Sequence, residues 1–272
     1  MSTLLEEWVS GNGLPGALVI DGHIHVSEWP HAATFRDADE AADLSVKEMD
    51  ANGVDAVCAV SGGYIWGLSD YRLGNDFLLA VWRRMPDRLI PFLGLNPNDT
   101  PARVLDEVAR MHDAGVRCIK LINHYQAGYP GDGPTLMAVY AFAARHGMLV
   151  FNHAWSEAEI RLIAGEYPGT DFIFGHYGGG YQDEVMIELP NVYTNIWMYG
   201  GRGWLDRGLG RVGAGKFMYG SDGFLNPLSV GIGPVVFAPL DDEEKRLVLG
   251  ITTARLLDKA GALPPRLKAR LA

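Results

Sequence analysis

Residues 17–26 read ALVIDGHIHV, an almost continuous apolar run that is rich in β-branched side chains and contains two histidines near its end. Seven further runs of this kind follow, at residues 54–62, 89–97, 116–125, 148–155, 170–178, 192–200 and 216–223. Runs that are apolar at nearly every position are expected of strands covered on both faces, as strands of parallel sheets are. The sequence therefore predicts eight parallel strands.

Amphipathic patterns with helix start and stop signals lie between most of these runs. The segment 100–115 opens with Thr-Pro, a capping residue followed by proline at the first helical position, and closes on glycine. The segment 38–53 closes on Asn-Gly, and 133–147 has proline near its start and glycine at its end. Two further helices are expected at 75–86 and 156–168.

Alternating strands and helices imply parallel strands that are joined by right-handed crossovers. Eight strand–helix units in 272 residues match a TIM (β/α)8 barrel in number and length. We therefore expect one α/β domain over residues 1–272, with its active site at the C-terminal ends of the strands. The alternative is an open, doubly wound sheet. A nucleotide-binding sheet of that type carries G-x-G-x-x-G after its first strand, and this fingerprint is absent here.

The composition indicates which kinds of binding partner and which cellular compartment to expect. The formal net charge is −10, which disfavours a nucleic-acid binder because phosphates require a basic surface. No apolar run approaches the ~18 residues that a membrane helix needs. Glu6 and Glu7 stand where a secretory signal would be basic and then apolar, and Cys58 and Cys118 lie in apolar stretches that indicate buried free thiols. We expect a cytoplasmic protein that binds neither nucleic acid nor membrane.

Polar side chains with metal-binding chemistry occur at the ends of four predicted strands. His23 and His25 end the first strand, His153 the fifth, His176 the sixth and Asp222 the eighth. Residues two apart on a strand point to the same side, so His23 and His25 can converge on one ion. His153 and Asp222 would complete a set of three imidazoles and one carboxylate. Such a set suits zinc, and also iron, cobalt or manganese.

Each of these residues has an ordinary structural interpretation when it is taken alone. The histidines of a single His-x-His motif are often simply half-buried at the protein surface. His176 can cap the following helix, and Asp222 in GSDG can be a turn residue. Their coincidence at four separate strand ends favours a metal site instead. His176, which is left over from the ligand set, is then expected to lie around the metal or to act as a general base.

The chain resembles the amidohydrolase superfamily, specifically its amidohydrolase-related branch. That branch includes aminocarboxymuconate-semialdehyde decarboxylase-like enzymes, resorcylate-type decarboxylases and lactonases. The matching stretches are DGHIHV at 21–26, IKL at 119–121, FNHAW at 151–155, FGHYGG at 174–179, YGSDG at 219–223 and LGITTARLL at 249–257. The resemblance therefore extends over nearly the whole chain.

This resemblance implies one divalent metal ion, with Zn2+ favoured, held by His23, His25, His153 and Asp222. It also implies that His176 contacts the water or substrate and helps to move protons, and that Asp222 accepts a proton from the water. Resorcylate-type decarboxylases tend to carry glutamate in place of the first histidine. The presence of His23 therefore favours other members of the branch.

Further residues are expected around this site. Lys120 on the fourth strand is either carbamylated between two metals, as in binuclear members of the superfamily, or unmodified beside one metal, and we favour the second. Arg72 and Arg202 could anchor a substrate carboxylate or be surface charges, and His124 could face the pocket mouth or solvent. The segment 224–240 contains several glycines and prolines and is expected to be a long loop at the catalytic end, which could act as a lid. Aromatic residues just past strand ends could wall a pocket for an apolar or planar substrate, or could pack between loops and helices: Tyr64, Trp66, Tyr125, Trp155, Tyr177, Trp197 and Tyr199.

Three functions are compatible with this sequence. The first is a metal-dependent hydrolase in which metal-bound hydroxide attacks a small lactone, ester or amide. The second is a non-oxidative, metal-dependent decarboxylase of a small unsaturated or aromatic carboxylic acid. The third is a catalytically idle barrel that binds a partner, and the presence of all five polar residues disfavours it. We expect a small-molecule substrate and leave a homodimer open as the oligomeric state.

Overall fold

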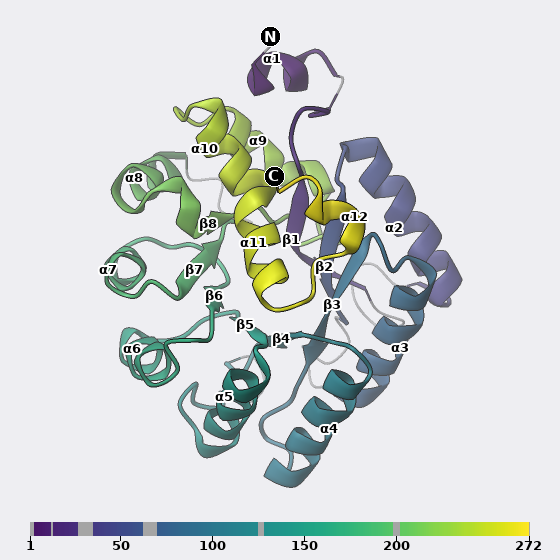
Figure 1. The fold of residues 1–272 in the computed structure, drawn as a ribbon, viewed down its shortest axis with the longest axis vertical. Helices are drawn as coiled ribbons and strands as arrows, with labels where there is room; N and C mark the ends of the chain where they lie inside the picture. The colour runs from purple at the N-terminus through teal and green to yellow at the C-terminus, as the bar shows by residue number, and fades with distance from the viewer. Residues whose placement is uncertain are drawn as a thin grey trace.

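The fold is a ring of parallel strands with helices around it (Figure 1). The computed structural model describes residues 3–11, 13–26, 35–61, 70–124, 128–197 and 202–271. Within these residues, eight strands follow one another in the sheet: β1 (Ile20–His25), β2 (Ala56–Val60), β3 (Leu89–Gly94), β4 (Cys118–Leu121), β5 (Leu149–Asn152), β6 (Phe172–Phe174), β7 (Val192–Asn195) and β8 (Phe217–Met218). Each pairs in parallel with the next, which confirms the predicted barrel and excludes the doubly wound sheet.

The chain that follows β8 closes the ring against β1. An isolated parallel bridge joins the two segments, and the Asp222 N–H donates to the His23 carbonyl at 3.0 Å. Gly22 is required at this closure, because a Cβ atom there would lie 2.5 Å from Asn195 Nδ2. The closure therefore brings the residues after β8 directly beside the histidines of β1.

Helices cover the outside of the ring, as Figure 1 shows. The helices between β1 and β8 are α2 (Ala38–Asn52), α3 (Tyr71–Arg84), α4 (Pro101–Asp113), α5 (Pro134–His146), α6 (Glu157–Glu166), α7 (Tyr181–Glu188) and α8 (Arg202–Val212). Thr100 caps α4 ahead of its proline, and Gly53 and Gly147 end α2 and α5 in the left-handed conformation. These ends agree with the predicted start and stop signals.

The start of α3 differs from the prediction. This helix begins at Tyr71 rather than at residue 75, because the Asp70 carboxylate accepts the Arg72 N–H at 2.9 Å and caps the helix there. The additional turn places the Arg72 side chain on the helix surface, and that position bears on its predicted role.

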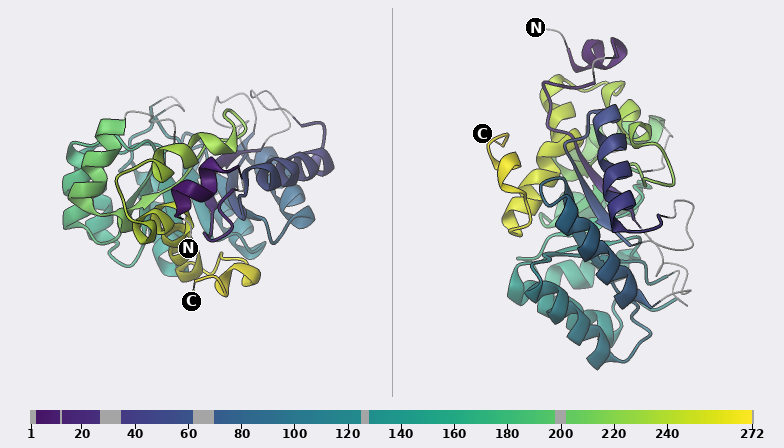
Figure 2. Two further views of the ribbon diagram at one scale, coloured as in Figure 1. Left: turned by 90° about the horizontal axis from the view of Figure 1, so that it is seen from above. Right: turned by 90° about the vertical axis from the view of Figure 1, so that its right-hand side faces the viewer.

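The remaining helices precede β1 or follow β8: α1 (Leu4–Val9), α9 (Ile232–Val236), α10 (Asp242–Arg246), α11 (Thr252–Lys259) and α12 (Pro265–Lys268). A π-helical segment, Leu247–Ile251, joins α10 to α11. The segment 224–240, expected as a long loop, contains α9, in which Ile232 and Val235 are fully buried. Arg266 of α12 donates to the Asp87 carbonyl, which precedes β3, so α12 lies at the N-terminal end of the barrel; Figure 2 shows it at the edge of the molecule.

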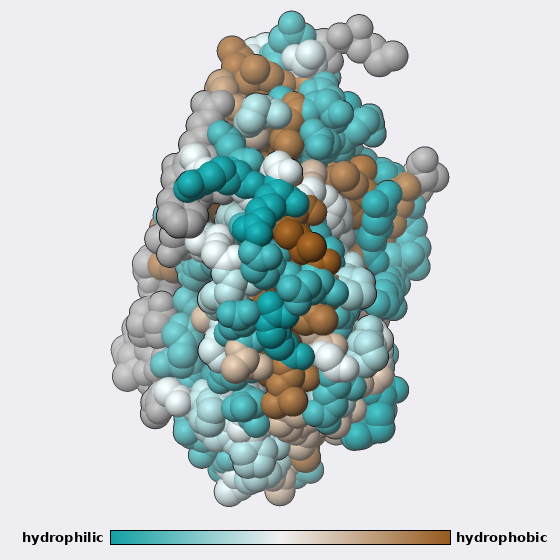
Figure 3. Space-filling model, turned by 90° about the vertical axis from the view of Figure 1, so that its left-hand side faces the viewer, coloured by the Kyte–Doolittle hydropathy of each residue, from teal (hydrophilic) through white to brown (hydrophobic). Residues whose placement is uncertain are grey.

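The interior and the surface differ as expected for a barrel covered by helices. Cys58 of β2 and Cys118 of β4 are buried free thiols, as predicted. Figure 3 shows the face on the left of Figure 1, where apolar side chains are scattered among hydrophilic ones. Exposed Leu162 of α6 and Ile187 of α7 are examples of single apolar side chains, which are common on protein surfaces. None of the described helices is both long enough and apolar enough to span a membrane.

Candidate metal centre

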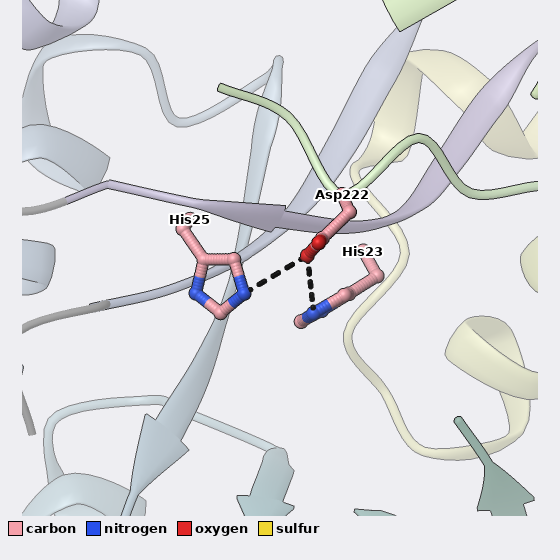
Figure 4. Close-up of side chains that lie close together, drawn as sticks. All are labelled: His23, His25 and Asp222. Carbon is pink, nitrogen blue, oxygen red and sulfur yellow. Dashed lines mark ion pairs between the residues drawn. The ribbon is translucent and has the colours of Figure 1, made fainter. Parts of the chain in front are cut away.

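Three side chains with metal-binding chemistry converge where β1 meets the chain after β8 (Figure 4). His23 and His25 lie on β1 two residues apart, and both Nε2 atoms face the same carboxylate oxygen, Oδ1 of Asp222. The distances are 3.3 Å from His23 and 3.1 Å from His25, and all three side chains are buried. Of the residues that the structure describes, these three alone form a close group of at least three potential His, Cys, Asp or Glu ligands.

The distances and the protonation states of this group fit a divalent cation. Ligand atoms bonded to zinc at about 2.0–2.2 Å in tetrahedral geometry lie about 3.3 Å apart, and the two observed nitrogen–oxygen distances match. Burial, followed by the charge of Lys120, lowers the pKa of His23 well below its ordinary value, so this imidazole is neutral. Burial raises the pKa of Asp222, but the hydrogen bonds with His23 and His25 outweigh it and lower the pKa, so the carboxylate is ionised. Neutral imidazole and ionised carboxylate are the forms that bind metal.

His153 and His176 form a second pair in the same region. His153 directly follows β5, His176 comes after β6, and their Nε2 atoms are 2.7 Å apart. Burial and the charge of Lys120 lower the pKa of His176 to about 4, and burial also lowers the pKa of His153. The ring of His153 lies 5.9 Å from that of Trp197, which in turn lies 4.1 Å from the ring of His23. The structure thus places His153 close to the three-residue group without including it in that group.

Trp197, which follows β7, connects the two groups. Its ring packs against His23, and its indole Nε1–H donates to Nε2 of His176 at 3.1 Å. The sequence indicated this residue only as an aromatic wall, because a hydrogen bond between residues on neighbouring strand ends is visible only in three dimensions. It is nevertheless one of the groups that orient His176.

The backbone at His176 and Asp222 is unusual. Among the described residues other than glycine, these two have positive φ angles, 53° and 59°. Residues with a Cβ atom rarely adopt this conformation, and its cost is of order 1–3 kcal/mol per residue when the surrounding structure enforces it. Such conformations are concentrated at functional sites, so both residues are held in place for a reason other than local preference.

Asp21 links the two halves of the three-residue group. Its Oδ1 accepts the backbone N–H groups of His23 at 3.0 Å and of Ser221 at 3.1 Å. The side chain is fully buried, and this burial raises its pKa to about 7. Asp21 lies inside the DGHIHV stretch, but its role could not be predicted without knowing that β1 and the chain after β8 are neighbours.

Lys120 of β4 lies within the barrel and is fully buried. Its Nζ is 3.7 Å from the centroid of the Phe151 ring and 4.6 Å from that of Trp197. Burial lowers its pKa well below the ordinary value for lysine. His124 is exposed at the end of the described segment after β4, with its ring 4.5 Å from that of His153.

Several residues predicted to surround the site lie elsewhere. Arg72 forms an ion pair with buried Glu107 of α4 at 3.2 Å, outside the barrel. Trp155 donates to the Tyr140 hydroxyl at 3.2 Å within the packed layer between strands and helices, and Tyr177 donates to Asp183 at 2.7 Å on α7. The sequence could not distinguish them from Trp197, because an aromatic side chain just after a strand can point either toward the predicted site or toward the surrounding helices. Residues outside the described part of the chain are Tyr64, Trp66, Tyr125 and Tyr199, together with the side chain of Arg202.

Comparisons with known proteins agree with this architecture. A family model described as amidohydrolase matches residues 20–259. Similar solved structures include 2,6-dihydroxybenzoate decarboxylase from Rhizobium, with 14% identity, a TM-score of 0.72, and coverage of 89% of this chain and 99% of that one. Dihydroxybenzoic acid decarboxylase from Polaromonas sp. JS666, which was solved with bound manganese, has 13% identity, a TM-score of 0.68, and coverage of 91% and 99%. 4-Oxalomesaconate hydratase from Rhodopseudomonas palustris has 14% identity, a TM-score of 0.69, and coverage of 93% and 99%. No curated protein matches significantly.

Proposed function

This chain belongs to the amidohydrolase family, in its amidohydrolase-related branch, and is therefore an enzyme of a metal-dependent class; from this premise we propose that it hydrolyses a small lactone, ester or amide. The observation that carries the proposal is the buried group of His23, His25 and Asp222 at the C-terminal ends of the barrel strands. That end is where barrel enzymes place their catalytic residues.

We assign His23, His25, His153 and Asp222 as the ligands of one divalent cation, with Zn2+ as the favoured ion. The first two histidines and Asp222 already lie at ligand-to-ligand distances. His153 is a neutral imidazole that would complete the set. Its ring lies 5.9 Å from that of Trp197, and the Trp197 ring packs against His23. Imidazole and carboxylate ligands of this kind suit zinc, and they also accept manganese.

When bound, a divalent cation supplies Lewis acidity, which polarises a carbonyl group and lowers the pKa of water. Asp222, which belongs to the ligand group, and His176, which contacts His153, are the groups that can accept the proton of the attacking water. Near pH 7 the Asp222 carboxylate is ionised and the His176 imidazole is neutral. After the oxygen of water bonds to the carbonyl carbon, His176 returns a proton to the leaving oxygen or nitrogen as the scissile bond breaks. Asp21 holds the segments of His23 and Asp222 together, because its Oδ1 accepts the backbone N–H groups of His23 and of Ser221.

We infer that Lys120 is unmodified and that the site holds one cation. Its Nζ lies 3.7 Å from the centroid of the Phe151 ring. A carbamate at Nζ would bring a negative charge against the negative face of that ring, whereas an amine fits there. This contact favours the mononuclear arrangement over the binuclear one.

The second candidate function is the non-oxidative decarboxylation of a small unsaturated or aromatic carboxylic acid. Two of the similar structures are decarboxylases of dihydroxybenzoic acids, and their names support this alternative. In that reaction His176 would deliver a proton to the carbon from which CO2 leaves. Resorcylate-type decarboxylases tend to have glutamate at the position of His23, so the histidine in this chain favours hydrolysis over decarboxylation.

Product analysis separates the two reactions. The metal-loaded enzyme is incubated in H2 18O with panels of lactones, esters, amides and aromatic acids, and the products are examined by mass spectrometry. Hydrolysis introduces one 18O atom into the new carboxylate, and H176A and D222N are expected to abolish it. Release of CO2 without incorporation of 18O would show that the reaction is decarboxylation and not hydrolysis. Unchanged turnover in both variants would refute the roles given to His176 and Asp222.

A further inference from the structure

A cavity of about 440 Å3 opens at the N-terminal end of the barrel. Its wall consists of the segments before β1, β2 and β3, the end of α2, and two arginines from the C-terminal part of the chain. Its volume falls within the range of about 300–1,000 Å3 that is usual for small-molecule sites. The metal centre lies at the opposite ends of the strands, so this cavity is a separate site.

Three arginines converge on one residue of this wall, Asp55. Nε of Arg88 donates to the Asp55 carbonyl at 2.9 Å, and Nη2 of Arg266 donates to the same oxygen. Nη1 of Arg270 donates to Oδ1 of Asp55 at 2.5 Å. Because two of the guanidinium groups share one acceptor and the third binds the same residue, all three lie close together at the cavity.

The positive charge of this cluster exceeds the negative charge around it. The wall contains these three arginines and two acidic residues, Asp50 and Asp55. Asp50, which accepts from Nη2 of Arg88 at 2.8 Å, has a side chain that is 63% exposed, and an exposed ion pair is weak. Among the described residues, Arg266 has no carboxylate partner, and partial burial, followed by the charge of Arg88, lowers its pKa. An anion in the cavity would offset the excess charge.

The arginines also attach the C-terminal part of the chain to the barrel. Arg266 donates to the Asp87 carbonyl at 2.8 Å, and Nη2 of Arg270 donates to the Ala17 carbonyl at 2.5 Å. These contacts use only part of the five N–H donors that each guanidinium group carries. Within the part of the chain that the structure describes, Nη1 of Arg88 and Nη1 of Arg266 make no hydrogen bond. Donors therefore remain for a ligand.

We propose that this cavity binds the phosphate group of a small phosphorylated molecule and that Arg88, Arg266 and Arg270 donate to its oxygens. A guanidinium group matches both phosphate and carboxylate oxygens. A carboxylate offers two oxygens and one charge, whereas a phosphate monoester offers three oxygens and up to two charges, which suits a cluster of three guanidinium groups. Buried Leu14 and Met49 give the wall an apolar part for the organic portion of the ligand. The proposal does not depend on the proposed function, since no metal ligand takes part.

Isothermal titration calorimetry at constant ionic strength tests the proposal with three probes: phenyl phosphate, inorganic phosphate and benzoate. The proteins are Zn2+-loaded wild type, R266Q, R270Q, R161Q and H25A. Glutamine keeps a donor for the carbonyl groups and removes the charge. R161Q is the matched control, because the side chain of Arg161 is 34% exposed, against 36% for Arg270, and also pairs with a carboxylate, that of Glu157 at 2.9 Å.

We expect saturable binding of phenyl phosphate to wild type, which R266Q and R270Q each weaken about 10-fold to 100-fold, as the loss of a hydrogen bond to a charged group does. R161Q should retain the wild-type affinity. H25A should also retain it, because this variant disrupts the metal centre and leaves the cavity unchanged. Inorganic phosphate should bind more weakly than phenyl phosphate because it makes no apolar contact, and benzoate more weakly because it has fewer oxygens and less charge.

Four results would overturn the proposal. The first is the absence of saturable binding of phenyl phosphate to wild type, a result that does not depend on whether any variant folds. The second is wild-type affinity in both R266Q and R270Q. The third is loss of binding in H25A, which would place the phosphate at the metal centre. The fourth is benzoate or inorganic phosphate that binds as tightly as phenyl phosphate, which would exclude a phosphorylated organic ligand. Urea unfolding shows whether R266Q and R270Q are folded, and if R270Q is not, R266Q decides.

Discussion

Asp21 offers a quantitative test of how the site is held together. Its Oδ1 accepts two buried backbone N–H groups, one from His23 and one from Ser221, across a separation of 200 residues in sequence. Asp21→Ala leaves both donors without an acceptor, at a cost of about 1–3 kcal/mol each. The expected loss in free energy of unfolding is therefore about 2–6 kcal/mol. Asp21→Asn keeps the oxygen that both donors use, so its loss should be less than half as large.

Urea unfolding of the metal-free protein, followed by tryptophan fluorescence, measures these losses. Wild type, D21A and D21N are compared by linear extrapolation with a common m-value. Zn2+ affinity provides the second measurement, because D21A removes the anchor shared by His23 and the segment that carries Asp222. We expect D21A to weaken Zn2+ binding about 10-fold to 100-fold, as other losses of residues that orient ligands do.

Two results would refute this reasoning. If D21A unfolds within about 0.5 kcal/mol of wild type, as a neutral surface substitution does, then the two N–H groups do not depend on Asp21. If D21N is as unstable as D21A, the charge of Asp21 matters more than the geometry of its oxygen. Unchanged Zn2+ affinity in D21A would show that the ligands are positioned independently of this residue.

Three further predictions follow from the structure. In Gly175→Ala the added Cβ atom would lie 2.4 Å from the Trp197 ring, so the variant should lose about 1–3 kcal/mol in free energy of unfolding, the usual cost of overpacking, and should have a lower kcat. A variant that is as stable as wild type in urea unfolding and fully active in steady-state assays would contradict this. Cys58 and Cys118 should not react with a thiol reagent at pH 8 while the protein is folded, because burial raises the pKa of both thiols, and both should react in denaturant; rapid labelling of the native protein would contradict their burial. Arg72→Ala should leave KM within about twofold of wild type, since this side chain is engaged in an ion pair outside the barrel; a large rise in KM would restore its role as a substrate anchor.

The strands and most helices could be predicted because their signals are local. Each strand is an apolar run covered on both faces, and α4 carries its cap and proline in consecutive positions, Thr100 and Pro101. The start of α3 was misplaced, because Asp70 as a cap is indistinguishable from an ordinary loop residue until its hydrogen bond to Arg72 is seen. The segment 224–240 was predicted to be a long loop because it contains several glycines and prolines, although residues 232–236 form α9.

Site residues could be predicted where a metal-binding residue type occurs at a position that strand periodicity or barrel closure points toward the site. They could not be predicted where only tertiary contacts determine the direction of the side chain. His23 and His25 follow from the two-residue repeat of a strand, and Asp222 follows from barrel closure. Trp155 and Trp197 both come just after strands, yet Trp155 contacts Tyr140 of α5, whereas Trp197 contacts His23 and His176. Nothing in the order of residues tells these two directions apart.

Metal content per chain tests the metal centre most directly. Protein purified without chelators and loaded with Zn2+ or Mn2+ is dialysed, and the bound metal is counted by elemental analysis. We predict one equivalent for wild type and for H146A, which removes an exposed histidine of α5, and far less than one for H25A and D222A. Wild type without metal after every loading condition, or H25A with a full equivalent, would contradict a centre built from His23, His25 and Asp222.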